Sequence, residues 1–248
     1  MFFSVVMCVN KDHDFLEAAI DSVLQQDYIN NFEFVIVANN CEDELYAKLN
    51  SYEDSRIKLF RTCIGQLCFN LNYAIDKSVG DYIIRMDSDD ICLPQRLSIT
   101  EDAILSNPGY EIFAFSANNI DDLGVKTGET ISGLNIKKDT IFFKNTIIHP
   151  SVAIKRSLIL KHGGYSGGFQ SEDYDLWLRL KRANSFMVKY SGVKVLNYRI
   201  HESQSRGNFL PYAEAASYLL REFLITKRKK SLLGCIYFSI KRYIKGTK

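Results

Sequence analysis

Residues 82–90 read Tyr-Ile-Ile-Arg-Met-Asp-Ser-Asp-Asp, a short apolar run that ends in three carboxylates. The run over 82–86 has the length and composition of a strand that is buried on both faces of a sheet. In open α/β sheets, ligands bind at the carboxyl ends of the strands, which is where Asp87, Asp89 and Asp90 stand. The stretch therefore predicts an α/β sheet with a polar site at one edge.

Strands and helices alternate on both sides of this stretch. Before it, apolar runs over 2–9, 34–38 and 57–60 predict strands, and amphipathic patterns over about 14–26, 42–49 and 67–78 predict helices. After it come a helix over 94–105, strands over 112–117, 147–154 and 193–200, a hairpin turn at 121–124 and a helix over 172–182. This order predicts an α/β fold with a mostly parallel central sheet flanked by helices.

Composition limits the class of protein further. Of 248 residues, 46% are hydrophobic and 24% are charged, which excludes long disorder and fibrous classes. No run of about 18 apolar residues is present, so no transmembrane helix is expected, and the N-terminus lacks the basic region of a signal peptide. The six cysteines form no CxxC pair, which favours reduced thiols and a cytoplasmic protein. We expect one domain over residues 1–206 and a helical C-terminal extension over 207–248.

The formal net charge of +2 is the balance of an acidic body and a basic tail. Residues 221–248 hold nine Lys or Arg and one acid, whereas residues 1–220 hold 22 basic and 28 acidic residues. This asymmetry predicts an anionic partner for the tail. A helix is expected over 231–245, with Phe238 on its polar side and an apolar face made of Leu232, Leu233, Ile236, Tyr237, Ile240, Tyr243 and Ile244.

Two interpretations of this helix stay open. A basic amphipathic helix with aromatic residues can lie in the interface of a membrane. The same helix can pack its apolar face on the body and leave its charges in solvent. The membrane is the favoured partner, and nucleic acid is not expected, because the body is acidic and no known binding motif is present.

The acidic motifs also allow two interpretations each. A divalent cation between the carboxylates and an acidic turn that caps the next helix fit residues 87–90 equally well. Glu172 and Asp173, which open a helix, suit either the helix dipole or a general base, and the dipole is the simpler explanation. His149 and His201 each follow a predicted strand and could bind a metal as neutral imidazoles. Trp177 is more typical of a packing residue than of a ligand contact.

A series of landmarks nevertheless runs through the chain in a fixed order. It comprises SVVM at 4–7, AIDSVLQQ at 19–26, FVIV at 34–37, Asn72, GDYI at 80–83, DSDD at 87–90 with Pro94, Arg96 and Leu97, HPS at 149–151, GGY at 163–165, EDYDLW at 172–177 and YRIH at 198–201. Over residues 3–206 this series resembles the family 2 glycosyltransferases, which have the GT-A, Rossmann-like fold of nucleotide-diphospho-sugar transferases. The resemblance implies a nucleotide-binding half over about 1–117 and an acceptor half over about 118–206.

The resemblance implies a role for each motif. Asp89, with Asp87 and His201, would bind Mn²⁺ or Mg²⁺ at the donor diphosphate, and Asp87 would also hold the ribose. Asp173 would be the catalytic base, and Glu172 would orient the acceptor or share that role. The donor side would further include Val9, Asn10, Asn39, Gln66 and Ser88, and the acceptor side His149, Gly164 and Trp177.

The implied reaction is an inverting transfer of a sugar from a UDP-, GDP- or dTDP-sugar to a glycan or lipid-linked acceptor in the synthesis of O-antigen, capsule or exopolysaccharide. The enzyme would work at the inner face of the cytoplasmic membrane. Asn39 stands where the family usually has an Asp that contacts the base, and Asn offers a donor as well as an acceptor. This departure leaves the nucleotide open.

Two other functions remain possible. A sugar-nucleotide nucleotidyltransferase usually needs a Gly-rich basic loop after the first strand, and residues 9–13 contain no glycine. A non-catalytic sugar-binding relative would keep the fold but not turn over a donor. Loss of turnover in Asp89→Ala and Asp173→Asn would exclude this second alternative.

Overall fold

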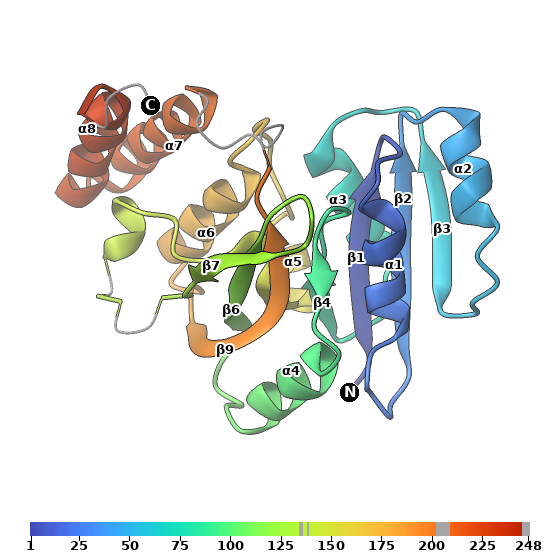
Figure 1. Cartoon of the computed structure of the whole chain (residues 1–248). Helices are drawn as coiled ribbons and strands as arrows, with labels where there is room; N and C mark the ends of the chain where they lie inside the picture. Colours follow the sequence, from blue (N-terminus) through green and yellow to red (C-terminus); the bar gives the residue numbers. More distant parts are fainter. Residues whose placement is uncertain (134–135, 138, 202–208, 245–248) are drawn as a thin grey trace.

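The structure, a computed structural model of the whole chain, describes residues 1–133, 136–137, 139–201 and 209–244 (Figure 1). In this part of the chain, nine strands form one sheet with helices on both faces. The predicted α/β fold with a mostly parallel sheet is confirmed. Its parallel character is complete in the first half of the sheet and gives way to mixed pairing in the second.

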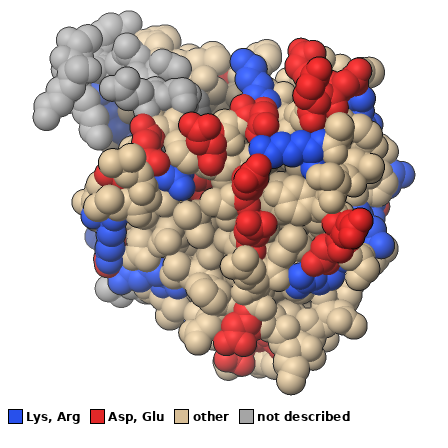
Figure 2. All heavy atoms as spheres, turned by 45° about the vertical axis from the view of Figure 1, so that its right-hand side comes forward, with Lys and Arg blue, Asp and Glu red and all other residues tan. Residues whose placement is uncertain are grey.

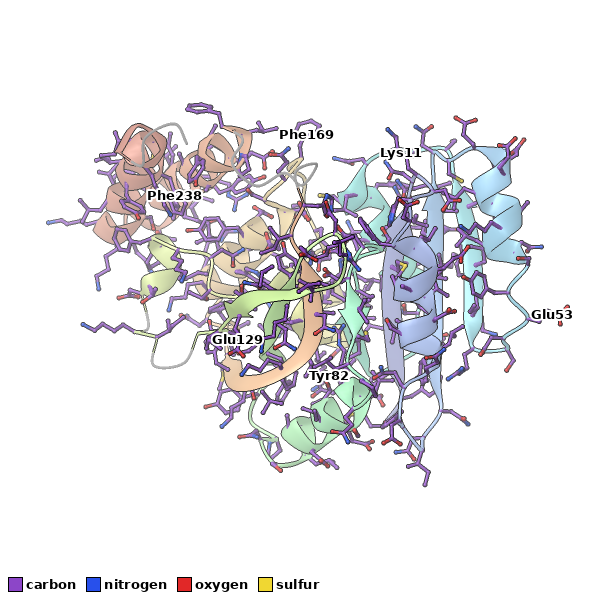
Figure 3. The ribbon with its side chains drawn as sticks, viewed as in Figure 1. Lys11, Glu53, Tyr82, Glu129, Phe169 and Phe238 are labelled. Atoms are coloured by element: carbon purple, nitrogen blue, oxygen red, sulfur yellow. The ribbon has the colours of Figure 1, made fainter. Side chains whose placement is uncertain are left out.

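The first half of the sheet is parallel, in the order β3-β2-β1-β4. Almost every residue of β1 and β2 is buried, which explains why these strands are continuous apolar runs and not alternating ones. The elements are β1 (Phe3–Val9), α1 (Leu16–Leu24), β2 (Phe32–Asn39), α2 (Asp43–Asn50), β3 (Ile57–Thr62), α3 (Leu67–Lys77) and β4 (Tyr82–Arg85). The carboxyl ends of these strands therefore meet at one edge, where Figure 3 labels Lys11 just after β1.

The second half of the sheet is mixed. β8 (Val152–Lys155) runs antiparallel between β4 and β6 (Ile112–Ile120), and β9 (Val188–Arg199) runs parallel to β6. The short β5 (Ile91–Cys92) pairs with β9, and β7 (Lys126–Thr130) pairs with β6 across the predicted turn. In that turn the Oδ1 atom of Asp121 accepts the backbone N–H groups of Leu123 and Val125, at 3.0 and 2.9 Å.

The helices divide into two layers that enclose separate apolar cores. α1, α2 and α4 (Arg96–Leu105) contribute buried residues to the core on one face of the sheet. α3, α5 (Arg156–Lys161) and α6 (Glu172–Arg182) contribute to the core on the other face. The sequence did not indicate α5 and β5, which have only six and two residues.

One predicted strand is mostly wrong. Of the strand expected over 147–154, only Val152–Ile154 is extended and paired, and His149–Ser151 forms a 3-10 turn. Pro150 explains the difference, because it has no N–H to donate to a neighbouring strand. The turn ends the strand early and leaves His149 to line the cavities described below.

The C-terminal extension forms a helical hairpin of α7 (Leu210–Thr226) and α8 (Lys229–Ile244), which packs on the α6 side of the sheet (Figure 1). Arg221 and Arg182 join it to the body by ion pairs to Asp175 and Glu222, both of 2.6 Å. Among the described residues, no helix has both the length and the apolar character needed to cross a bilayer.

The predicted helix in the tail exists, and the structure shows which of its sides faces the body. Phe238, which was expected on the polar side, is buried against Tyr174 with 5.7 Å between ring centroids. Leu233, Ile236 and Ile240 of the predicted apolar face are exposed instead. Side chains beyond Lys241, including the predicted Tyr243 and Ile244, and residue Lys245 itself lie outside the part described.

Candidate active site

Three carboxylates gather where β4 ends. Asp87, Asp89 and Asp90 lie between β4 and β5, and their nearest oxygen atoms are all within 4.8 Å of one another. The strand itself brings them together, because the chain leaves the parallel edge of the sheet in a tight turn before β5. The motif at 87–90 was therefore enough to predict this cluster from the sequence.

Arginines hold this turn in place. The backbone N–H of Arg199, at the end of β9, donates to Oδ1 of Asp90 at 2.8 Å, and its Nε donates to the carbonyl oxygen of Asp89 at 2.9 Å. The buried Arg85 donates to Asp87 and to the carbonyl oxygen of Met86. The buried Arg96 bonds the carbonyl oxygens of Arg85 and Pro150, which ties the turn to the segment that carries His149.

The electrostatics of the turn favour a cation. Burial, together with the charges of Asp87 and Asp89, raises the pKa of Asp90 well above its usual value. Its Oδ2 atom is buried and has no hydrogen-bond partner among the described residues. Carboxylate oxygens in such a group are the ligands that Mg²⁺ and Mn²⁺ prefer, so the residues present fit a divalent metal.

Two histidines flank the carboxylates. Nε2 of His201 lies 3.0 Å from Oδ2 of Asp89, and Nε2 of His13 lies 3.1 Å from Oγ of Ser88. Burial lowers the pKa of His13, so its imidazole is neutral at physiological pH. No sequence motif singles out His13, although its place just after β1, the neighbour of β4, is the available signal.

The second acidic pair opens α6. Oδ2 of Asp173 accepts a hydrogen bond from Nδ2 of Asn145 at 2.6 Å, and Oδ1 accepts the N–H of Tyr174 at 2.7 Å. Burial and the charge of Asp173 raise the pKa of Glu172 to about 7. Burial also raises the pKa of Asp173. Two neighbouring carboxyl groups with raised pKa values, one of them near neutrality, are suited to general acid–base chemistry.

His149 lies between the two acidic groups. Its Nε2 is 2.7 Å from the hydroxyl of Tyr165, and its Nδ1 is 3.8 Å from Oε1 of Glu172. Burial and the charge of Arg85 lower the pKa of His149 well below its usual value, so this histidine is neutral. The 3.8 Å separation is longer than a hydrogen bond, so the neutral imidazole stands beside Glu172 without adding charge to the pair.

Two adjoining cavities connect these groups. One, of about 700 Å³, is lined on the metal side by Asn10, His13, Ser88, Asp89 and His201. The other, of about 730 Å³, is lined by Asn145 and Asp173 and by Pro211 and Tyr212 of α7. Both are lined by Asp87, His149, Gln170, Glu172 and Tyr198. The two acidic motifs therefore face a common space.

Several residues named from the sequence do not line this space. Val9 and Asn39 are buried at the ends of β1 and β2, and Gln66 precedes α3, where its carbonyl oxygen accepts Nδ2 of Asn70. All three residues lie at the carboxyl edge of the sheet, beside the two cavities and outside their walls.

Two further residues that were expected on the acceptor side have a structural role. Trp177 is fully buried and packs on Phe186, 6.2 Å between centroids, which corrects its expected place on the acceptor side. Gly164 has a φ of +64°, and a Cβ there would come within 2.1 Å of Asn72. Gly164 is therefore needed for a turn, and the structure does not put it at the cavity wall.

The C-terminal hairpin also holds a loop of the site, which the sequence did not reveal. Glu214 of α7 accepts the backbone N–H of Phe169 at 2.7 Å with Oε1 and that of Gln170 at 3.2 Å with Oε2. Figure 3 shows Phe169 between the hairpin and the sheet edge that carries Lys11. The loop leads directly into Glu172 and Asp173, so α7 contributes to how these acids are positioned.

Comparisons with known proteins agree on the kind of fold. The family model described as Glycosyl transferase family 2 matches residues 4–163. The chain is 39% identical over 247 residues to the O-antigen biosynthesis glycosyltransferase WbnJ of Escherichia coli, with 98% of this chain and 96% of WbnJ covered.

Two more distant proteins add detail. The UDP-Glc:alpha-D-GlcNAc-diphosphoundecaprenol beta-1,3-glucosyltransferase WfgD of Escherichia coli is 26% identical, over 99% of this chain and 93% of its own. The solved structure of the mannosyltransferase PcManGT from Pyrobaculum calidifontis, in complex with GDP-Man and Mn²⁺, superposes with a TM-score of 0.66 at 14% identity, over 97% of this chain and 70% of that one.

Proposed function

This chain belongs to glycosyltransferase family 2 and is an enzyme of hexosyltransferase type, and from that premise we propose that it transfers a sugar from a nucleoside diphosphate to a glycan hydroxyl with inversion. The observation that carries this proposal is the shared space between two acidic groups, Asp87–Asp90 on one side and Glu172–Asp173 on the other. The first group has the chemistry to hold a cation with a diphosphate, and the second has the chemistry to accept a proton.

The donor side would hold the nucleotide and a divalent cation. Asp89 and Asp87, with His201, are the residues that would hold Mn²⁺ or Mg²⁺, and the solved relative PcManGT contains Mn²⁺ beside GDP-Man. The chemistry that such a cation supplies when bound is neutralisation of the charge on the departing diphosphate. The residues that would face the nucleotide are Asn10 and Ser88, which line the cavity on the metal side, and Val9, Asn39 and Gln66 would support the nucleotide from beside it; all five lie in the half of the chain over about 1–117.

The acceptor side would carry out the proton transfer. As the acceptor hydroxyl oxygen attacks the anomeric carbon, the bond from that carbon to the diphosphate oxygen breaks, and Asp173 takes the hydroxyl proton. Asn145 fixes Asp173 through the 2.6 Å hydrogen bond. Glu172, beside the neutral His149, would orient the acceptor. One displacement inverts the anomeric carbon, so an α-linked donor gives a β-linked product.

The acceptor is proposed to be a lipid-linked glycan. WbnJ is named for O-antigen biosynthesis, and the name of WfgD includes a diphosphoundecaprenol acceptor. These relatives support a role in O-antigen or related surface polysaccharide synthesis. A lipid carrier would require the enzyme to work at the inner face of the cytoplasmic membrane, which agrees with the basic extension over 207–248.

A ligand screen followed by a transfer assay tests the proposal. Melting temperature is measured with UDP, GDP and dTDP, each with and without Mn²⁺, because a ligand that binds only the native state raises it. We expect one nucleotide with Mn²⁺ to raise the melting temperature, and the matching nucleotide sugar to be turned over. Asp102→Ala, which removes an exposed carboxylate of α4, is the matched control for Asp89→Ala. Absence of any nucleotide-dependent shift, with or without Mn²⁺, would contradict the proposal.

A further inference from the structure

The side of α8 that faces away from the body is apolar. Leu233, Ile236 and Ile240 are 56%, 50% and 46% exposed, and their spacing of three and four residues puts them on one side of the helix. Tyr237, beside them, is also exposed. An amphipathic helix on a protein surface normally has the opposite arrangement, with its large apolar side chains turned inward.

The packing of α8 fixes this orientation. At Gly234, an added Cβ would come within 2.2 Å of the carbonyl oxygen of Phe142, so this side of the helix can approach the body only because it has no side chain there. Ser231 and Phe238, one turn before and one turn after, are buried on the same side. Rotating the helix to bury Leu233 and Ile236 would break these contacts.

α7 adds exposed apolar side chains to the same hairpin. Leu220, Leu224 and Ile225 are all exposed, and Leu224 is 57% exposed. Single exposed leucines are common in soluble proteins, but rows of them on two packed helices are typical of an interaction surface. Figure 1 shows the hairpin at one corner of the molecule, beside the body and not enclosed by it.

The exposed charges of the hairpin are basic. Four consecutive bases, Lys227, Arg228, Lys229 and Lys230, span the turn between the two helices and the start of α8, and all four are exposed. Of these, Lys230 is paired with Asp139 of the body at 2.5 Å. The two acids of the hairpin, Glu214 and Glu222, are both buried and face the body. Among the described side chains, the outward surface of the hairpin therefore combines apolar rows with positive charge only. Figure 2 shows a contrasting face of the molecule, where Asp and Glu stand among Lys and Arg.

We infer that this outer face of the α7–α8 hairpin binds the surface of an anionic lipid bilayer, with its leucines and isoleucines among the acyl chains and its basic turn at the lipid phosphates. Interfacial helices combine these two features, whereas a protein partner would not require four consecutive bases in a hairpin whose own two acids are both buried. The surface stands on its own observations, and its purpose, to bring the cavity lined by Pro211 and Tyr212 close to a lipid-linked acceptor, rests on the proposed function.

Vesicle sedimentation of the full chain tests the inference. Vesicles of phosphatidylglycerol with phosphatidylethanolamine are compared with vesicles of phosphatidylcholine alone. We expect binding to the anionic vesicles, weakened by salt, and at least about tenfold weaker binding of the triple variant Leu233→Ser, Ile236→Ser, Ile240→Ser. Replacing Lys229 and Arg228 by Ser should weaken binding by about fivefold per base on the anionic vesicles only.

The control removes exposed apolar side chains elsewhere. Leu123→Ser with Val125→Ser, in the β6–β7 turn, should bind vesicles as the wild type does. All altered positions are exposed, so melting temperatures should stay close to that of the wild type. The nucleotide-dependent shift in melting temperature should survive in the triple variant, which separates this inference from the proposed function.

Three outcomes overturn the inference: no binding of the wild type to anionic vesicles, equal binding of the triple variant, or a wild-type dimer that the triple variant dissociates while vesicle binding is absent. The last would assign the face to a second copy of this chain. Vesicle binding without any nucleotide binding would instead count against the proposed function and would still support lipid binding by the outer face of the hairpin.

Discussion

The two acidic groups of the site are supported in different ways. Asp87–Asp90 leave the end of a buried strand and accept hydrogen bonds from Arg85 and Arg199, and Arg96 bonds the carbonyl oxygen of Arg85 just before them. Glu172 and Asp173 begin a helix; Asn145 bonds the carboxylate of Asp173, and Glu214 of the C-terminal hairpin holds the loop before the pair. The proposed donor side is thus held by the sheet itself, whereas the proposed acceptor side also depends on the C-terminal hairpin, which follows the sheet in the chain.

The largest expected difference between the two acidic groups is in what is lost when one of their carboxylates is replaced. Asp173→Asn removes the proton acceptor but keeps the shape of the site, so transfer should fall by about a thousandfold while the Mn²⁺-dependent nucleotide shift survives. Asp89→Ala should remove both transfer and that shift. Sugar transfer and melting temperature are measured on both variants. If Asp173→Asn lost nucleotide binding as well, the division into a donor side and an acceptor side would be wrong.

The support of the donor side should show in stability. Arg199→Ala removes the hydrogen bonds of the buried guanidinium to the carbonyl oxygens of Asp89 and Asp121. We expect the free energy of unfolding to fall by about 2–4 kcal/mol, because buried carbonyl oxygens lose charged donors. Urea denaturation measures the change, and Lys58→Ala, at an exposed position of β3, is the control. A loss no larger than that of the control would show that the turn does not depend on Arg199.

These contrasts also explain how far the sequence could be used. Contiguous motifs, Asp87–Asp90 and Glu172–Asp173, could be recognised, because each lies at the end of one strong element. The partners of Arg199 could not, since Asp89 lies 110 residues away along the chain and the pairing of β9 with the two-residue strand β5 brings them together.

Helix orientation was the other limit. α8 has apolar residues on both sides, so periodicity alone separated Phe238 from the larger apolar set but did not show which side faces the body. The deciding feature was Gly234, whose missing side chain permits contact with Phe142. In the same way Pro150 shortened the strand predicted over 147–154, although only the fold shows that the resulting turn carries His149 to the site.

The acceptor side should respond to pH near neutrality. Because burial raises the pKa of Glu172 to about 7, its proton is retained at pH 6 and lost at pH 8. If the ionised pair is the active form, kcat/KM should rise by about tenfold over this range. Glu172→Gln should remove the step between pH 6 and 8. A wild-type profile that is flat there, or a step that persists in Glu172→Gln, would assign the titration to another group.

The smallest effect is expected from the hairpin's support of the acceptor side. Glu214→Ala takes away the acceptor of two backbone N–H groups, those of Phe169 and Gln170, just before Glu172 and Asp173. We expect acceptor KM to rise or kcat to fall by about fivefold, because the loop shifts the acids from their working geometry. Steady-state kinetics with a soluble acceptor measure this, with Ala213→Ser on the exposed side of α7 as the control.

The Glu214 variants also separate positioning from mere stability. Glu214→Gln keeps a carbonyl oxygen that can accept one of the two N–H groups, so it should recover part of the lost activity. Nucleotide binding should be unchanged in both variants, because Asp87–Asp90 are held by the sheet. Equal losses of nucleotide binding and of transfer would mean that α7 supports the whole site, and the contrast between the two acidic groups would then be one of contacts only and not of function.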